Sequence, residues 1–214
     1  MAFGMQTAAT PDFADIVKYD ANAGRFFRVD YNLDTREKAP IDITTPPPRF
    51  AIDFGSLEVG YGRFTATGPE FHIVPMEQKL PAQPLDKDEK GRLLFRPVFR
   101  VRLFGKVLDG LREWASAANC VLETVDDLYN KFRAAPEAQS GRIPIVELTR
   151  TMPVVFGRGS RQRTLYAPCF NIVGWTDRVP AMGERTVPPP TPPPPVSTAV
   201  ATSSDTVIED EIPF

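Results

Sequence analysis

Hydrophobic and polar residues alternate along the segment from Phe99 to Leu103. Phe99, Val101 and Leu103 fall on one side of an extended chain, and Arg100 and Arg102 fall on the other. This period of two is typical of a β-strand that buries one face. The pattern therefore predicts a half-buried strand with a basic outer face.

Other segments are rich in aromatic and β-branched residues and predict further strands. They are found at 25–32, 49–68, 71–76 and 143–178, the last turning around "GRGSRQ". Gly55, Gly60 and Gly62 interrupt the second segment at positions typical of bulges or tight bends. We expect this segment to be a hairpin or a long, strongly curved strand pair.

The hydrophobic period changes to three and four residues in the middle of the chain. This period predicts an amphipathic helix over 107–119, with Trp114 on its apolar face and thus in the core. A second helix is predicted to begin at Thr124 as its N-cap, with an apolar stripe of Val125, Leu128, Tyr129 and Phe132.

The order of elements is strands, then helices, then strands, which excludes an all-α fold and an alternating parallel α/β fold. Five curved strands with a helix before the fourth predict a mainly β (α+β) fold, an OB-like barrel spanning 24–182. Residues 1–23 are expected to form a flexible lead-in. An α+β sheet domain of another topology is the alternative.

Charge is distributed unevenly, although the formal net charge is only -2. Residues 1–90 carry a net charge of -4, residues 91–182 a net charge of +6, and residues 183–214 a net charge of -4. The second half of the predicted domain is therefore the basic part of the chain, which suits a polyanionic partner.

Chemistry typical of an enzyme is sparse in this sequence. His72, the only histidine, lies between apolar neighbours and is interpreted as a structural strand residue rather than a catalytic base. Cys120 and Cys169 are isolated, which favours reduced thiols over a disulfide or a zinc site. We therefore predict no enzyme, no cofactor and no metal, with a metal-dependent nuclease built from scattered carboxylates as a minor alternative.

The first ten residues, "MAFGMQTAAT", lack the basic and apolar regions of a secretory leader. The sequence contains no run of about eighteen apolar residues, which is the length that a membrane-spanning helix needs. We expect a protein of the bacterial or phage-infected host cytoplasm, with no membrane contact.

Arginine and aromatic residues interleave through the β-rich segments. Guanidinium groups neutralise phosphates, and flat rings stack on unpaired bases whatever the sequence, so this pairing favours binding of single-stranded nucleic acid. The candidate binding residues are Tyr61, Arg63, Phe64, Arg92, Arg96, Arg100, Arg102, Arg158, Arg161, Arg163, Tyr166, Trp175 and Arg178. The alternative for each ring is a place in the core, and for each arginine a solvated strand edge.

The segment 183–214 is rich in Pro, Ser and Thr and is predicted to be a disordered linker. Its "PPPTPPPP" run favours polyproline II, a stiff spacer of roughly 25 Å at about 3.1 Å per residue. The sequence then closes on an acidic cluster and an apolar end: Glu209, Asp210, Glu211, Ile212, Pro213 and Phe214.

This end resembles the C-terminal tip of bacterial single-stranded DNA-binding proteins. The resemblance covers some six residues and has fewer acids than the usual tip. It implies that Phe214 fills an apolar pocket of a partner while Glu209 to Glu211 face a basic rim, and that the partners are replication, recombination and repair proteins. The β-rich body is more loosely similar to the single-stranded DNA-binding proteins of bacteriophages and prophages.

The sequence thus predicts a non-catalytic, largely sequence-independent single-stranded DNA-binding protein with an acidic partner-recruiting tail. It leaves open a homo-oligomer. The second hypothesis is a β-domain protein-interaction or assembly factor whose tail is a peptide ligand. The dependence of affinity on salt separates these two hypotheses, because phosphate contacts weaken steeply as ionic strength rises.

Overall fold

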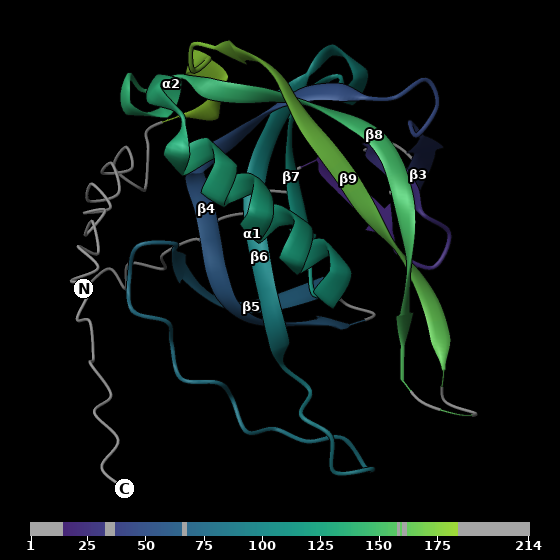
Figure 1. Cartoon of the computed structure of the whole chain (residues 1–214). Helices are drawn as coiled ribbons and strands as arrows, with labels where there is room; N and C mark the ends of the chain where they lie inside the picture. The colour runs from purple at the N-terminus through teal and green to yellow at the C-terminus, as the bar shows by residue number, and fades with distance from the viewer. Residues whose placement is uncertain (1–14, 33–36, 66–67, 158, 160–161, 184–214) are drawn as a thin grey trace, which may run out of the picture.

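The computed structural model describes residues 15–32, 37–65, 68–157, 159 and 162–183 (Figure 1). This part of the chain is mainly β, with one nine-stranded sheet and a few helices. The strands follow the order β3-β2-β1-β7-β6-β4-β8-β9, and β5 pairs with β4.

The strands are β1 (Ile16–Asp20), β2 (Arg25–Asn32), β3 (Glu37–Asp42), β4 (Arg49–Thr65), β5 (Gly68–Pro75), β6 (Arg96–Gly105), β7 (Gly110–Ser116), β8 (Ile143–Phe156) and β9 (Arg163–Thr176). The helices are α1 (Asn119–Ala134) and α2 (Pro136–Gln139), with 3-10 turns at Lys106–Leu108 and Pro180–Met182. Neighbouring strands pair antiparallel except β1 and β7, which are parallel.

The sheet curls until β9 meets the beginning of the described chain. The amide of Tyr166 in β9 donates to the carbonyl of Ala21, just after β1, at 2.7 Å. The hydroxyl of Tyr19 donates to the carbonyl of Tyr166 at 2.8 Å. These two bonds join β9 to the β1–β2 hairpin, which inserts between β7 and β9.

A cluster of aromatic rings fills the interior of the curled sheet. Phe26 of β2 lies 5.7 Å from Phe50, 5.2 Å from Trp114 and 6.1 Å from Phe170, measured between ring centroids. Phe26 and Trp114 are fully buried. Rings from four strands thus meet at one point, and truncating such a ring to alanine typically costs about 3–5 kcal/mol.

Helix α1 packs over this core with the apolar stripe that the sequence predicted. Val125, Leu128, Tyr129 and Phe132 are all buried, which confirms that stripe. Phe54 of β4 contacts the helix, with its ring centroid 5.4 Å from that of Tyr129 and 5.0 Å from that of Phe132.

Strand β4 is one strand of 17 residues that bends at a bulge. Its register with β6 shifts between Asp53 and Glu58, a stretch that includes Gly55, where the sequence predicted a bulge. Further along, a Cβ at Gly60 would lie only 2.2 Å from the carbonyl oxygen of His72 in β5. Glycine at this position is what allows β5 to approach so closely.

The prediction of a helix over 107–119 is wrong. A 3-10 turn at Lys106–Leu108 and a left-handed Asp109 (φ 58°) reverse the chain into β7, which pairs with β6. Trp114 is buried as predicted, but on a strand whose alternate residues face the core. The three- and four-residue spacing combined a turn with a strand, two elements of different period.

Helix α1 begins at Asn119, with Ala118 as its N-cap, so Thr124 is not a cap. The Thr124 hydroxyl instead donates to the carbonyl of Cys120 one turn earlier, at 2.9 Å. A threonine inside a helix can donate its hydroxyl to the carbonyl four residues earlier in this way, instead of capping the helix.

The predicted lead-in over 1–23 also needs correction. Its last part forms β1, which lies inside the sheet between β2 and β7. The turn-rich stretch after β2 contains the edge strand β3, whose six residues are all exposed. Within the described residues, no helix has the length and apolar character needed to cross a membrane.

Candidate nucleic-acid interface

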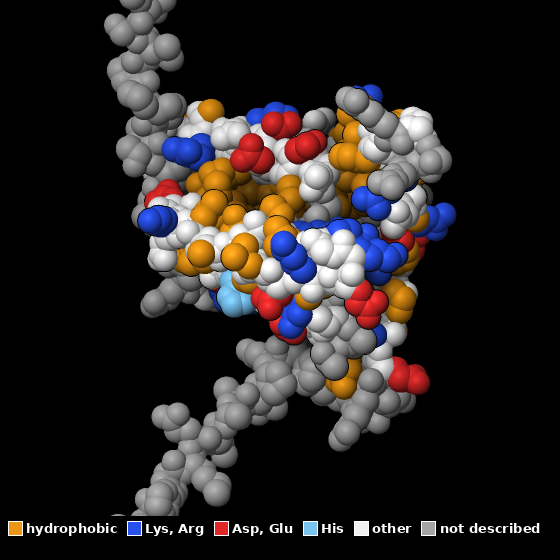
Figure 2. Space-filling view, turned by 90° about the horizontal axis from the view of Figure 1, so that it is seen from below, with side chains coloured by type: hydrophobic (Ala, Val, Ile, Leu, Met, Phe, Trp, Pro, Cys, Tyr) orange, Lys and Arg blue, Asp and Glu red, His pale blue; other side chains and the backbone are white. Residues whose placement is uncertain are grey.

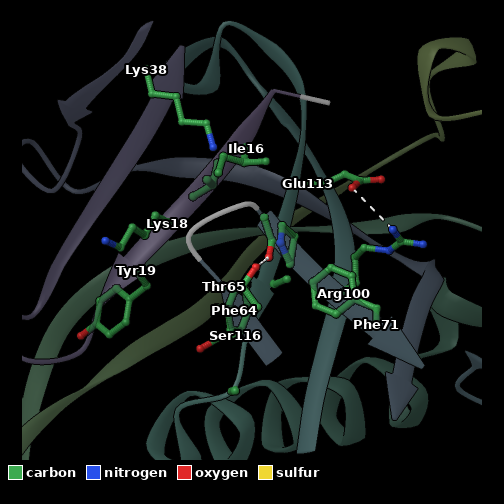
Figure 3. A pocket seen from close by; sticks show the side chains of 15 residues that line it. Ile16, Lys18, Tyr19, Lys38, Phe64, Thr65, Phe71, Arg100, Glu113 and Ser116 are labelled. Atoms are coloured by element: carbon green, nitrogen blue, oxygen red, sulfur yellow. Dashed lines mark hydrogen bonds and ion pairs between the residues drawn. The ribbon is translucent and has the colours of Figure 1, made fainter. Parts of the chain in front are cut away.

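A groove of about 490 Å³ lies on the outer side of the curled sheet, between β1 and the β4–β5 ribbon. We call it the strand groove and define it by Ile16, Lys18, Lys38, Phe64, Phe71, Arg100 and Glu113, which line it together with Tyr19 and smaller residues (Figure 3). Its lining comes from six strands, β1, β3, β4, β5, β6 and β7.

Ile16, Val17, Lys18 and Tyr19 all line the strand groove, and strand alternation decides which of them are exposed. In β1 the buried Val17 and Tyr19 alternate with the exposed Ile16 and Lys18. Lys18 therefore projects to the outer side while its neighbours hold the strand against the core.

The aromatic wall of the strand groove is formed by Phe64 of β4 and Phe71 of β5. Their ring centroids are 5.8 Å apart in an edge-to-face arrangement. Phe64 is 56% exposed, although a phenylalanine normally gains by burial. An exposed ring braced by a second ring offers a platform on which a flat ligand group can stack.

The opposite side of the strand groove is cationic. Lys18 and Lys38 are exposed, and neither forms an ion pair with another residue in the described part of the chain. Figure 3 places the two lysines on β1 and β3, across the groove from Phe71 and Arg100. Both ammonium groups are thus available to an anion.

Arg100 lies at the base of the strand groove and is held by two acids. Its Nε donates to Glu58 at 2.7 Å, and its Nη1 is 4.0 Å from the carboxylate of Glu113. Burial opposes the charge of Arg100, but the hydrogen bond and ion pair with Glu58 outweigh it and raise the pKa of the guanidinium. Arg100 also lies over the ring of Phe71, 5.8 Å from its centroid.

Of the residues predicted from the sequence, the strand groove brings together Phe64 and Arg100. Tyr61 and Arg63 lie on the other side of β4, because they alternate with Gly62 and Phe64. Arg63 pairs with Glu70 at 2.7 Å and covers the ring of Phe95 at 5.0 Å.

Three predicted arginines are exposed but stand apart from the strand groove. Arg92 pairs with Asp88 at 2.6 Å in the loop after β5. Arg96 begins β6 opposite Gly62, and Arg163 begins β9 opposite Phe156. None of the three lines the groove.

Other predicted residues serve the fold. Arg178 forms an ion pair with the fully buried Asp53 at 2.5 Å. Arg102 donates to the carbonyl of Met182 at 2.7 Å. Both contacts fasten the segment after β9 onto the sheet, so these guanidinium groups are engaged within the protein.

Trp175 and Tyr166 also have structural contacts. Trp175 packs against the core, with its ring stacked on Phe132 at 6.1 Å. The backbone of Tyr166 closes the sheet against β1. Arg158, Arg161 and the tail residues Glu209 to Phe214 lie outside the described residues.

The sequence prediction missed Lys18, Lys38 and Phe71. A usable signal was present for Lys18, because "IVKYD" alternates apolar and polar residues from Val17 to Asp20. No such signal marked Lys38, since β3 is exposed throughout, contains Pro40 and has no apolar–polar alternation. Such a strand is recognised only by its pairing with β2.

Two features of the described chain bear on the metal and histidine chemistry considered from the sequence. Among these residues, no group of three or more His, Cys, Asp and Glu side chains is placed to hold a metal ion. His72 packs edge-on against Phe95, with ring centroids 5.1 Å apart. Comparison with family models, curated proteins and solved structures finds no match to this chain.

Proposed function

We propose that this protein binds single-stranded DNA through the strand groove, without catalysis and largely without sequence preference. One observation carries the proposal. The same groove contains Lys18 and Lys38, which form no ion pair within the described residues, and the exposed ring of Phe64, which packs against Phe71. Cations that neutralise phosphates and a ring that stacks on bases are the two requirements of such binding.

The path of the chain supports an OB-type barrel as the scaffold. The long strand β4 pairs with both β6 and β8, β6 pairs with β7, and α1 precedes β8. Taken as first to fifth strands, β4, β6, β7, β8 and β9 have the connectivity of an OB fold with its helix before the fourth strand. The inserted β1–β2 hairpin departs from the minimal pattern, since β7 pairs with β1 instead of β9.

This correspondence also favours the location of the strand groove. OB folds receive oligonucleotides on the face of their second and third strands, between the loops that follow the first and fourth strands. Here those strands are β6 and β7, which contribute Arg100 and Glu113 to the groove, and the connection after β4 contributes β5 with Phe71.

Exclusion of duplex DNA follows from the aromatic side of the strand groove. Bases in a duplex are stacked on one another and unavailable, whereas unpaired bases present free faces to Phe64. Stacking on one ring contributes on the order of 1–3 kcal/mol per base.

Residues 209–214 are proposed to recruit replication, recombination or repair proteins. The acids and terminal aromatic residue suit a partner with an apolar pocket and a basic rim. Recruitment is separate from DNA binding, so loss of this segment is expected to spare the strand groove.

The direct test is fluorescence anisotropy of labelled oligo-dT at several salt concentrations. We expect the affinity to fall steeply with salt, and Lys18→Ala to flatten the logarithmic slope by about 0.7 per lost phosphate contact. Lys131→Ala is the matched control, because Lys131 is exposed on α1 and does not line the groove.

Two outcomes would contradict the proposal. One is a wild-type chain that fails to bind the oligonucleotide at low salt. The other is a binding affinity that does not respond to salt, which would favour the protein-interaction hypothesis.

A further inference from the structure

The described chain has a second groove, which is apolar and differs in charge from the strand groove. It has a volume of about 350 Å³ and lies between α1 and the lower part of β4 and β6. We call it the end groove and define it by Leu57, Val59, Met76, Leu122, Glu123 and Asp126. Figure 2 shows a hollow with a hydrophobic floor and acidic side chains along one rim.

Charge excludes two occupants of the end groove. Its charged lining residues, Glu123 and Asp126, are both acids. Burial raises the pKa of the Tyr129 phenol, Arg133 over its ring opposes this rise, and Glu77, beside Met76, adds to it. Nucleic acid would be repelled there, and so would the acidic residues Glu209 to Glu211.

A long loop projects from the molecule beside the end groove. Residues 77–95, here called the arm, connect β5 to β6 and extend below the barrel in Figure 1. The arm carries two of the exposed large hydrophobic residues, Leu80 at 54% and Leu85 at 78% exposure. Connections of this length without regular secondary structure are uncommon and are typically either functional or linker segments.

The arm is held in shape by its own hydrogen bonds. Asp88 donates its amide to Arg92 at 2.8 Å, and Leu94 donates to Asp86 at 2.8 Å. The side chain of Gln83 donates to the carbonyl of Phe95 at 3.0 Å, and Phe95 is buried. With these bonds in place, Leu85 is exposed and does not line the end groove of its own chain.

The structure therefore assigns the end groove to the arm of a second copy of this chain. Leu85 and Leu80 supply exposed apolar side chains that match the apolar floor of the groove, and Pro81 and Pro84 beside them restrict the backbone to extended conformations. Lys79 precedes Leu80 and Lys87 is two residues beyond Leu85, so cations accompany both leucines toward the acidic rim. The arm also carries Asp86, Asp88 and Glu89, of which Asp88 pairs with Arg92, and its match to the groove therefore depends on the leucines first.

This inference is independent of the proposed DNA binding. Each copy offers one arm and one end groove, so the contact can close on itself as a reciprocal dimer or continue as a chain of copies. On single-stranded DNA, a continuous chain of copies would place neighbouring copies in contact and make binding cooperative along the DNA.

Sedimentation velocity of the full chain across a wide range of concentration tests the inference. We expect reversible self-association of the wild type. Leu85→Asp in the arm and Leu122→Glu in the end groove should each lower the association constant at least about tenfold, because each removes apolar burial from the contact. Val173→Asp, at an exposed hydrophobic position of β9 outside both elements, should leave it unchanged.

Mixing the two variants gives the sharpest result. The Leu122→Glu chain keeps its arm and the Leu85→Asp chain keeps its groove, so the mixture retains one intact contact and should associate where each variant alone does not. A wild type that stays monomeric at all concentrations, or a mixture no more associated than its parts, would overturn the inference. Should Leu122→Glu fail to fold, Glu123→Lys combined with Asp126→Lys reverses the rim charge at exposed helix positions and takes its place.

Discussion

Phe64 is the residue whose substitution should most clearly separate an effect on the proposed binding from an effect on stability. It is 56% exposed, and its one recorded ring contact is with Phe71. In Phe64→Ala we expect roughly tenfold weaker binding of oligo-dT, because stacking supplies on the order of 1–3 kcal/mol per base and 1.4 kcal/mol is a factor of ten. Anisotropy titrations measure this loss.

Urea unfolding of Phe64→Ala supplies the control. The free energy of unfolding should change little, since the ring buries little area in the fold. A variant that binds oligo-dT as tightly as the wild type would remove Phe64 from the interface.

Asp53, in contrast to Phe64, is a residue whose contacts lie inside the fold. Its carboxylate is fully buried and pairs with Arg178 at 2.5 Å, and it also accepts from the amide of Gly55 at 3.1 Å. Asp53→Ala leaves a charged guanidinium without its acid in a buried setting, which typically costs about 3–5 kcal/mol. We expect a loss of this size in the free energy of unfolding, measured by urea titration.

The exposed pair of Arg25 and Asp42, at 2.7 Å, is the comparison. Arg25→Ala should change the free energy of unfolding by no more than about 1 kcal/mol, since solvent screens an exposed ion pair. Equal losses in the two variants would mean that Asp53 does not hold the segment after β9 in place.

At the scale of elements, the hydrogen bond between Tyr19 of β1 and Tyr166 of β9 makes stability depend on pH. Burial, the largest cause, raises the pKa of the Tyr19 hydroxyl, which donates to the carbonyl of Tyr166. In the unfolded chain the phenol ionises at a pKa of about 10. The stability linked to Tyr19 is therefore complete below about pH 10 and is lost as the pH rises above it.

Tyr19→Phe tests this hydrogen bond. We expect it to lower the free energy of unfolding by about 1 kcal/mol near neutral pH, through loss of the hydrogen bond, and to abolish the alkaline loss that belongs to Tyr19. Urea unfolding at about pH 8 and about pH 11, on either side of the ordinary phenol pKa, measures both effects. Tyr129, whose pKa burial also raises, is present in both proteins and cancels in the comparison. A difference between the two proteins that stays constant with pH would contradict the assignment.

The type of an element, though not its boundaries, was predictable where a single period governed a segment. The alternation at 99–103 correctly predicted β6, and the stripe from Val125 to Phe132 correctly predicted a helix. The prediction failed between them, because Leu108 lies in a turn and Trp114 on a strand, yet their spacing imitates a helix face. A local pattern cannot reveal that a turn separates two of its members.

At the scale of the whole molecule, the acidic segment 205–214 and the cationic strand groove are connected by one chain. Removing this segment takes away Asp205, Glu209, Asp210 and Glu211. We expect the truncated chain to bind oligo-dT as tightly as the full chain or more tightly at low salt, because a competing polyanion has been removed. The difference should vanish at high salt, where charges are screened.

Anisotropy titrations of both chains at low and high salt measure this effect. Weaker binding by the truncated chain at low salt would show that the segment contributes to the interface rather than competing with it.

The sequence by itself determined the β-rich class, the stripe of α1, the strand β6 and the candidacy of Phe64 and Arg100. These depend on residue type and local period, which a sequence displays directly. It also marked arginine as the expected source of positive charge.

The tertiary structure decided which of those charges are available. Arg178 and Arg102 are engaged by Asp53 and by the carbonyl of Met182, whereas Lys18 and Lys38, from strands not predicted, face the strand groove. A partner that comes from a distant strand has no trace in the local pattern, because sheet pairing and curl bring the two together only in the folded chain. For this reason the sequence could propose residue types for a binding groove, while only the fold shows which of those residues lie together.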